Sequence, residues 1–239
     1  MEKQEQITSL KTEEDMAYSA QKTASTLQIA FLLVVSIICY ACQSETKTEH
    51  LPYYNTPNFT PLFINNKDSV NLLVPHQIAN FAFKNQNNQT ITQKDVEGKI
   101  HIADFFFTSC GSICPIMTTH MKKIDSVYKD EKDLVLLSYS VTPWLDSVKI
   151  LKDYAQRYNV TNPNWHFLTG SKSDIYTLAR QSYFAEEDLG FTKDSTNFLH
   201  TEHFLLIDKN KRIRGIYNGT LELEINQLIK DIAILRKED

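Results

Sequence analysis

The sequence has few cysteines and no excess of positive charge. Only four cysteines occur among 239 residues, too few for the disulfide framework that holds many small secreted domains together. The formal net charge is −4, so the chain lacks the basic surplus that nucleic-acid binding requires, and we expect no nucleic-acid partner. Hydrophobic residues make up 42% of the chain, enough for the packed core of one domain with an appendage.

A hydrophobic run long enough to cross a membrane is also lacking. The segment Leu27–Ala41 is apolar but shorter than the ~20 residues that a membrane-spanning helix needs. It has the length of the hydrophobic region of a signal peptide. The acidic residues at 13–15 are atypical of such a signal, and translation starting at Met16 would remove them.

Residues 41–44 (ACQS) resemble a bacterial lipobox, although Cys39 stands where these signals usually carry leucine. We predict cleavage before Cys42 and lipid attached to its sulfur; an uncleaved short anchor and a plain signal peptide are the alternatives. All three export the domain, and the lipoprotein interpretation anchors it on the periplasmic side of a membrane. The predicted organisation is a signal or lipoprotein anchor at 1–41, a flexible polar tether at 42–72 and a folded domain at 73–239.

Strand and helix patterns alternate along the predicted domain. Strands are expected at 78–83 and 89–91, paired as a hairpin, and at 102–107, 134–141, 165–168, 204–207 and 212–217; helices are expected at 115–128, 146–158, 173–183 and from 220 onward. The near-continuous apolar runs at 102–107 and 134–141 are typical of central parallel strands. This order predicts an α/β domain of the thioredoxin-like type, with a mixed central sheet flanked by helices and an N-terminal hairpin.

Two cysteines, Cys110 and Cys114, directly follow one of these buried strands, and Pro115 begins a helix. Unpaired backbone N–H groups and the helix dipole stabilise a thiolate at such a position. If Cys39 leaves with the signal and Cys42 is acylated, this pair holds the only free thiols of the folded domain. The pair therefore indicates a function: a loop disulfide, a soft-metal site, or a switch between the two.

The three residues between the cysteines allow both sulfurs to point to one side and bind an ion. Soft thiolate ligands favour copper(I) or zinc, but structural zinc normally takes four protein ligands and the domain has no second cysteine pair. Two thiolates and one imidazole fit copper better. Among seven histidines, His200 and His203 flank the start of a strand expected beside the cysteine-bearing strand. In an extended segment their odd separation places at most one of them toward the thiols.

Residues 107–117 (FTSCGSICPIM) resemble the cysteine motif of the Sco/SenC proteins, with Ser112 where many members have Asp. Residues 140–143 (SVTP) are similar to the family's SVDP segment, with Thr142 replacing the usual acid. Residues 165–170 (WHFLTG) are similar to its W-x-x-L-T-G stretch, and 200–208 (HTEHFLLID) resemble its histidine, strand and turn. The resemblance spans roughly residues 78–235.

This resemblance implies a thioredoxin-like domain that binds copper through Cys110, Cys114 and His200. In the family the histidine ligand stands eight residues before the turn residue, here Asp208, which selects His200 over His203. It also implies a membrane-tethered copper chaperone that is not an enzyme and that assists assembly of the binuclear copper site of cytochrome c oxidase. The copper-bearing subunit of the oxidase would be its partner, and no residue identifies the copper donor.

Two other interpretations use the same cysteines. A thiol–disulfide oxidoreductase would attack with Cys110 and resolve the mixed disulfide with Cys114, and a copper or redox sensor would signal rather than deliver. The three-residue loop and the distant histidine favour metal binding over redox chemistry alone. Nearby, Asp104 lies at an apolar strand position and is expected to need a hydrogen-bond partner, whereas Met117 and Met121 are expected to pack in the core.

Overall fold

The computed structural model describes residues 50–185 and 201–238. The predicted signal segment, the lipidation site Cys42 and the predicted ligand His200 lie outside the described residues. Within the described ranges no helix is long and apolar enough to cross a bilayer.

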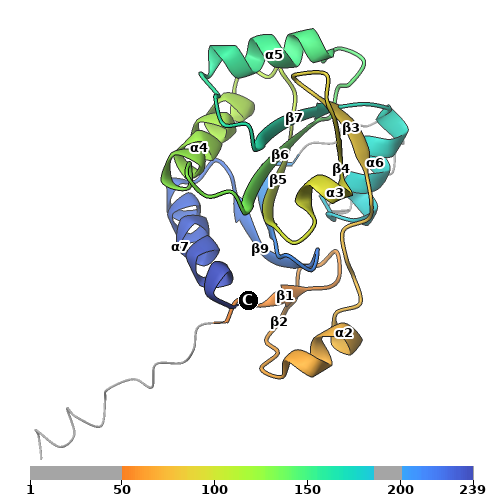
Figure 1. Cartoon of the computed structure of the whole chain (residues 1–239), viewed down its shortest axis with the longest axis vertical. Helices are drawn as coiled ribbons and strands as arrows, with labels where there is room; N and C mark the ends of the chain where they lie inside the picture. Colours follow the sequence, from red (N-terminus) through yellow and green to blue (C-terminus); the bar gives the residue numbers. More distant parts are fainter. Residues whose placement is uncertain (1–49, 186–200, 239) are drawn as a thin grey trace, which may run out of the picture. The chain divides into compact units, whose positions relative to one another are not determined.

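Nine strands in the described part of the chain form one mixed sheet (Figure 1). They are β1 (Tyr53–Tyr54), β2 (Pro61–Leu62), β3 (Ala82–Asn85), β4 (Thr90–Thr92), β5 (Ile100–Phe106), β6 (Leu134–Ser140), β7 (Trp165–Thr169), β8 (His203–Ile207) and β9 (Ile213–Asn218). Their order across the sheet is β2-β1-β9-β8-β5-β6-β7-β3-β4. Strands β5, β6 and β7 are parallel, and β8 pairs antiparallel with β5. The mixed sheet predicted from the sequence is confirmed.

Helices cover both faces of this sheet (Figure 1). The helical segments are η1 (Lys67–Ser69), α2 (Val70–Leu73), α3 (Gln93–Val96), α4 (Ile113–Val127), α5 (Val148–Arg157), α6 (Lys172–Gln181) and α7 (Glu222–Glu238). Buried side chains of α4, α5 and α7 share one core cluster, and those of α3 and α6 share the other. The central strands are therefore covered on both sides, which explains their nearly continuous hydrophobicity.

Strand β5 contributes alternate side chains to the two cores. Ile102 and Phe106 belong to the cluster that contains Cys114, whereas Ala103 and Phe105 belong to the opposite cluster. Because side chains alternate along a strand, Asp104 points to the same face as Cys114.

The N-terminal hairpin is present but shifted along the chain. The first strand was expected at 78–83, whereas β3 ends at Asn85 and its partner β4 begins at Thr90. The Asn85 carboxamide oxygen accepts hydrogen bonds from the backbone N–H groups of Asn87 and Gln89, both at 2.9 Å. With this side-chain turn the first strand ends two residues later, and the second begins one residue later, than the hydrophobic pattern indicates.

The folded domain begins earlier than the sequence indicates. The tether was expected to reach residue 72, but from His50 onward the chain forms β1, β2, η1 and α2. Strand β1 pairs antiparallel with β9, with Tyr54 opposite Ile213. The local sequence gives little sign that these residues are folded, because the side chain that holds them in place lies about 160 residues later in the chain.

The buried Arg214 side chain holds the start of the domain in place. Its guanidinium donates to the carbonyl oxygens of Leu51 at 2.6 Å and Pro52 at 3.0 Å, and pairs with the Glu238 carboxylate at 2.6 Å. It also lies over the Tyr53 ring, 3.9 Å from the centroid. The start of the domain is thereby joined to the C-terminal end of α7.

Candidate metal centre

The two cysteines lie where β5 gives way to α4. Cys110 is half-buried in the connecting loop, and Cys114 is buried in the first turn of the helix. The helix begins at Ile113, two residues before the predicted start at Pro115. Both cysteines are free, so the structure shows the dithiol form of the pair.

The electrostatic environment favours a thiolate on Cys110. Partial burial raises the pKa of its thiol, but hydrogen bonds from the backbone N–H groups of Cys114, Ser112 and Ile113 and from the Cys114 thiol outweigh that effect. Together they lower the pKa from 9.0 to about 7. The Cys114 N–H lies 3.4 Å from the Cys110 sulfur. The unpaired donors of the first helical turn thus stabilise the anion, as the sequence predicts.

Cys114 has the opposite character. Burial, with a smaller contribution from the neighbouring Cys110 sulfur, raises the pKa of its thiol to about 12, against a hydrogen bond from the Phe107 N–H. Near neutral pH the pair therefore holds one half-buried, ionisable sulfur and one buried, protonated sulfur. Such a pair suits a soft cation, which replaces the remaining proton when it binds.

A buried carboxylate, Asp146, holds the segment that leads into the cysteine loop. It accepts hydrogen bonds from the Thr108 hydroxyl at 2.5 Å and the Thr108 N–H at 3.3 Å. It also accepts from the hydroxyls of Ser140 at 2.6 Å and Thr142 at 2.9 Å. Asp146 is only 1% exposed, so these four donors replace water around the charge. The sequence pattern marks Asp146 only as the start of a helix and does not indicate this role.

Thr142, which departs from the SVDP pattern, takes part in this cluster. Its hydroxyl donates to the Asp146 carboxylate. A cluster of polar side chains at the ends of β5 and β6 was the available signal in the sequence, because parallel strands end at the same edge of a sheet.

The six histidines in the described residues have other partners. His76 contacts the Ser182 carbonyl, His101 the Tyr183 hydroxyl, His166 the Asn85 carboxamide, His120 the Gly219 carbonyl, His203 the Thr201 hydroxyl, and His50 the Glu238 carboxylate. Within 50–185 and 201–238 no three His, Cys, Asp or Glu side chains form a group that could hold a metal ion. In this part of the chain the two cysteines therefore have no third ligand of these residue types beside them.

His203 faces away from the cysteines. Its neighbour Phe204 packs in the same core cluster as Cys114, whereas Leu205 packs in the opposite one. Because side chains alternate along β8, His203 shares the face of Leu205. This agrees with the expectation that at most one of the two histidines faces the thiols.

Asp104 lies beneath the cysteine-bearing turn and has the partner that the sequence analysis required. The Ser138 hydroxyl donates to it at 2.5 Å, and the Trp165 indole N–H donates to Ser138 at 3.1 Å. Burial raises the pKa of Asp104 to about 7, against a smaller lowering by Ser138. Met117 and Met121 are buried in the same core cluster, which confirms their packing role.

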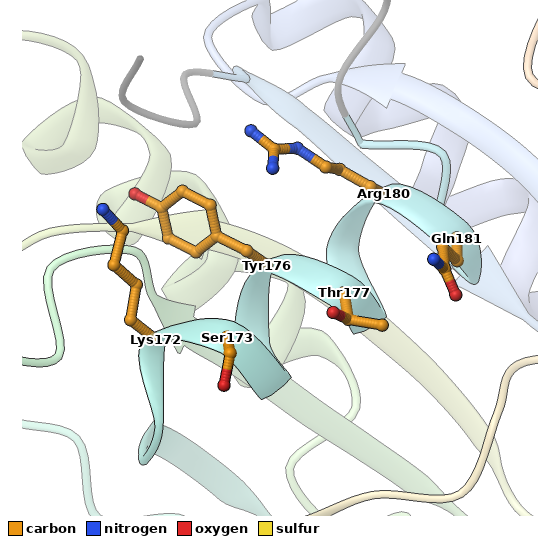
Figure 2. Close-up of a pocket in the computed structure, with 6 residues that line it drawn as sticks. All are labelled: Lys172, Ser173, Tyr176, Thr177, Arg180 and Gln181. Carbon is orange, nitrogen blue, oxygen red and sulfur yellow. The ribbon is translucent and has the colours of Figure 1, made fainter. Parts of the chain in front are cut away.

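Figure 2 shows a shallow hollow over α6, and neither cysteine lines it. Six residues of that one helix line it: Lys172, Ser173, Tyr176, Thr177, Arg180 and Gln181. Lys172 and Arg180 lie over the Tyr176 ring at 5.1 and 5.3 Å from its centroid. The hollow contains no thiol or imidazole and stands on the helix of the opposite core, so it adds nothing to the metal centre.

Comparison with known proteins identifies the family. The model of the SCO1/SenC family matches residues 73–236. The chain belongs to the SCO1/SenC family. The match contains the cysteine loop, the Asp146 cluster and the position of His200, so the resemblance seen in the motifs extends from the end of α2 to near the end of α7.

Solved SCO1/SenC proteins share the fold. A SCO1/SenC family lipoprotein from Bacillus anthracis is 32% identical, with a TM-score of 0.59 over 67% of this chain and 95% of its own. BsSco, described as a member of the Sco family of cytochrome c oxidase assembly proteins and as having a disulfide switch, is 30% identical, with a TM-score of 0.58 over 69% and 95%. Bradyrhizobium japonicum ScoI, solved with copper bound, is 22% identical, with a TM-score of 0.53 over 66% and 98%, and supports the fold alone. The thioredoxin-like architecture predicted from the sequence is confirmed.

Proposed function

We propose that this SCO1/SenC protein is a membrane-tethered copper chaperone that assists assembly of the binuclear copper site of cytochrome c oxidase. Cys110, Cys114 and His200 hold the copper, and the copper-bearing subunit of the oxidase receives it. The domain is exported and is held on the periplasmic side of the membrane by lipid on Cys42. The Bacillus anthracis relative, a lipoprotein, and BsSco, an oxidase assembly protein, support this combination.

The observation that carries the proposal is the unequal thiol pair at the start of α4. Cys110 has a pKa of about 7, so a large share of it is thiolate near neutral pH, and it is half-exposed, so it can take copper from a donor. Cys114 lies one helical turn further on and completes a soft two-sulfur site once its proton is displaced. His200 supplies the third ligand, since the described histidines are engaged elsewhere and His203 faces the other core.

Oxidation of the pair would control copper loading. A disulfide between Cys110 and Cys114 removes both thiolates, so an oxidised protein cannot hold copper through two sulfurs. The disulfide switch described for BsSco supports this part of the proposal. Copper titration of the full chain, reduced and pre-oxidised, tests this control by oxidation. We expect tight binding only by the reduced form. Equal binding by both forms would show that oxidation does not control copper loading.

A matched pair of histidine variants tests the metal site. The full chain, reduced, is compared with His200→Ala and His203→Ala by copper stoichiometry and by thiolate-to-copper absorption. We expect one copper per chain in wild type and in His203→Ala, and loss or a changed spectrum in His200→Ala alone. Cys110→Ser and Cys114→Ser should each abolish the absorption band. Identical behaviour of the two histidine variants would overturn the assignment of His200.

The same pKa values favour one second candidate, a thiol–disulfide oxidoreductase. The Cys110 thiolate would attack a partner disulfide, forming a mixed disulfide and releasing one partner thiol. Cys114 would then displace the second partner thiol, leaving a Cys110–Cys114 disulfide and a reduced partner. Reduction of a disulfide in the oxidase subunit by the copper-free protein, unaffected by His200→Ala, would place this activity ahead of copper delivery.

A further inference from the structure

Exposed apolar side chains gather on the segment between β2 and the end of α2. Phe63 is 73% exposed, Leu72 is 82% exposed and Leu73 is 51% exposed. Single exposed apolar residues are common on protein surfaces, but these three lie within eleven positions of one another in a segment that is otherwise rich in polar residues.

Helix α2 is held so that it presents this apolar surface outward. Val70 and Val74 are buried on its inner side. The Arg212 guanidinium donates to the Asn71 carboxamide at 2.7 Å and to the Val74 carbonyl at 3.1 Å, which fixes the helix against the turn before β9. Leu72 and Leu73 are therefore displayed on a fixed element.

The same end of the domain receives the chain from its N-terminal segment. The Leu51 N–H donates to the Glu238 carboxylate at 2.7 Å, and Lys67 donates to the Glu238 carbonyl at 2.6 Å. In Figure 1 β1, β2, α2 and the C-terminal end of α7 lie together at one end of the domain. The entry point of the chain and the elements that carry the exposed apolar residues thus lie at one end of the domain, and Phe63, Leu72 and Leu73 are part of the outer surface of that end.

We propose that this surface faces the membrane and that Phe63, Leu72 and Leu73 insert at the boundary between lipid headgroups and acyl chains. The inference rests on the proposed lipid anchor at Cys42. Only eight positions separate Cys42 from His50, so even a fully extended linker holds the domain within about 28 Å of the anchored residue. So short a linker gives a local concentration in the millimolar range, at which a weak apolar contact is populated.

The proposed contact with the bilayer depends on insertion of apolar side chains and not on attraction between charges. Lys67 on this segment is followed at once by Asp68, so the segment carries no excess of either charge. Phe and Leu side chains are typical of segments that bury an apolar face about 5–10 Å into the interface. The contact should therefore form on zwitterionic lipid and persist at high salt.

In this orientation the thiols of Cys110 and Cys114 lie at the end of the domain that points away from the bilayer. α4 and α7 run side by side in the same direction, since His120 contacts the Gly219 carbonyl near the start of α7 and Tyr128 contacts the Ile229 carbonyl further along. The 17 residues of α7 span about 25 Å. The cysteine loop, at the first turn of α4, thus lies about one helix length above the membrane-facing end, open to a partner protein.

Tryptophan fluorescence of the full chain in vesicles tests this orientation. Leu72→Trp is compared with Leu223→Trp, a matched control because Leu223 is 81% exposed near the other end of α7. Each lipidated variant is reconstituted into phosphatidylcholine vesicles with or without brominated acyl chains, which quench nearby indoles. The wild type provides the baseline from Trp144, which is exposed, and Trp165, which is buried.

We expect brominated lipid to quench the added fluorescence of Leu72→Trp about two-fold or more relative to Leu223→Trp, with little change at about 0.5 M NaCl. Phe63→Trp should behave like Leu72→Trp, and circular dichroism confirms that each variant is folded. Equal quenching of the two leucine variants, no quenching, or strong quenching of wild-type Trp144 would overturn the proposal.

Flotation of the vesicles distinguishes failure of the lipid anchor at Cys42 from failure of the proposed orientation of the domain. A chain that floats with the vesicles but shows no quenching at position 72 is anchored in another orientation, which contradicts this inference alone. A chain that does not float contradicts the lipid anchor, and the inference falls with it. Copper binding, measured independently, decides the metal site in either case.

Discussion

The Thr108 hydroxyl lies 2.5 Å from the Asp146 carboxylate and joins the end of β5 to the loop that follows β6. Thr108 stands two residues before Cys110, so this contact fixes the start of the cysteine loop. The rest of the loop is held by the first turn of α4. The geometry of the two sulfurs therefore depends on a side chain about 35 residues away in sequence and outside the cysteine motif.

Asp146→Ala should destabilise the protein and disturb Cys110. The Thr108, Ser140 and Thr142 donors would lose a buried acceptor, and we expect a loss of about 2–4 kcal/mol in the free energy of unfolding. Asp146→Asn, which retains one oxygen, should lose less.

Urea unfolding and the pH dependence of Cys110 alkylation measure the two effects of Asp146. Asp153→Ala is the control, because its ion pair with Lys149 is exposed to solvent and contributes little to stability. A variant at 146 that loses stability while Cys110 titrates as in wild type would show that Asp146 supports the fold but not the loop.

The thiol pair should react in two separate pH ranges in the reduced, metal-free protein. Cys110 should be alkylated with a midpoint near pH 7, whereas Cys114, with a pKa of about 12, should stay unmodified at neutral pH. Cys114→Ala removes the thiol that donates to the Cys110 sulfur, so the Cys110 midpoint should move upward. Mass spectrometry after timed alkylation gives both rates. Equal reactivity of the two thiols in wild type would contradict the assigned environments.

Asp104 should make stability depend on pH. Burial raises its pKa from 3.8 to about 7, so between these values the folded state holds a proton that the unfolded state has released. Stability contributed by this group is therefore present below about pH 4, declines as the pH rises toward 7 and levels off above it. Between about pH 5 and pH 8 the decline should amount to a few kcal/mol.

The Asp104→Asn variant isolates that effect. Its carboxamide oxygen can still accept from Ser138, but it has no proton to lose, so the slope assigned to Asp104 should disappear. Unfolding free energies of wild type and variant, measured across the same pH range in reduced protein, give the difference. Parallel curves would mean that Asp104 is ionised at lower pH than its burial indicates.

The central strands could be predicted from the sequence, because strands buried on both faces form nearly continuous hydrophobic runs. The expected strands at 102–107 and 134–141 became β5 and β6 with shifts of two residues or fewer at their ends. The start of α4 was placed two residues late because Ser112, its N-cap, forms no side-chain capping bond and leaves no local signal.

Features that depend on distant partners were not predictable in the same way. Residues 50–72 are polar and contain several prolines, and their order comes from Arg212 and Arg214, more than 130 residues later. At the metal site the cysteines were predictable from their position between strand and helix. The Asp146 cluster was missed, because polar residues at the ends of two parallel strands indicate that side chains meet there, but no spacing rule tells which of them form hydrogen bonds. The role of His200 remains a prediction, since that residue lies outside the described residues.

Removing the Glu238 carboxylate should loosen the start of the domain. In Glu238→Ala, Arg214 keeps Asp208 at 3.6 Å but loses its closest ion-pair partner, and the Leu51 N–H loses its acceptor. Removing one partner of a buried pair typically costs about 3 kcal/mol or more. Amide hydrogen exchange should show fast exchange at Leu51 with little change in the cysteine loop. Lys237→Ala, at the neighbouring exposed position, is the control and should leave Leu51 protected.

The attachment of the chain at Leu51 also determines how the domain bears a mechanical load. Force applied through the residues before His50 passes first into Arg214, Glu238 and the short pairing of β1 with β9. These contacts lie about one helix length from Cys110, on the far side of the domain core. With the proposed lipid anchor, thermal undulation of the membrane would therefore strain the Arg214 contacts before it deforms the sulfur pair.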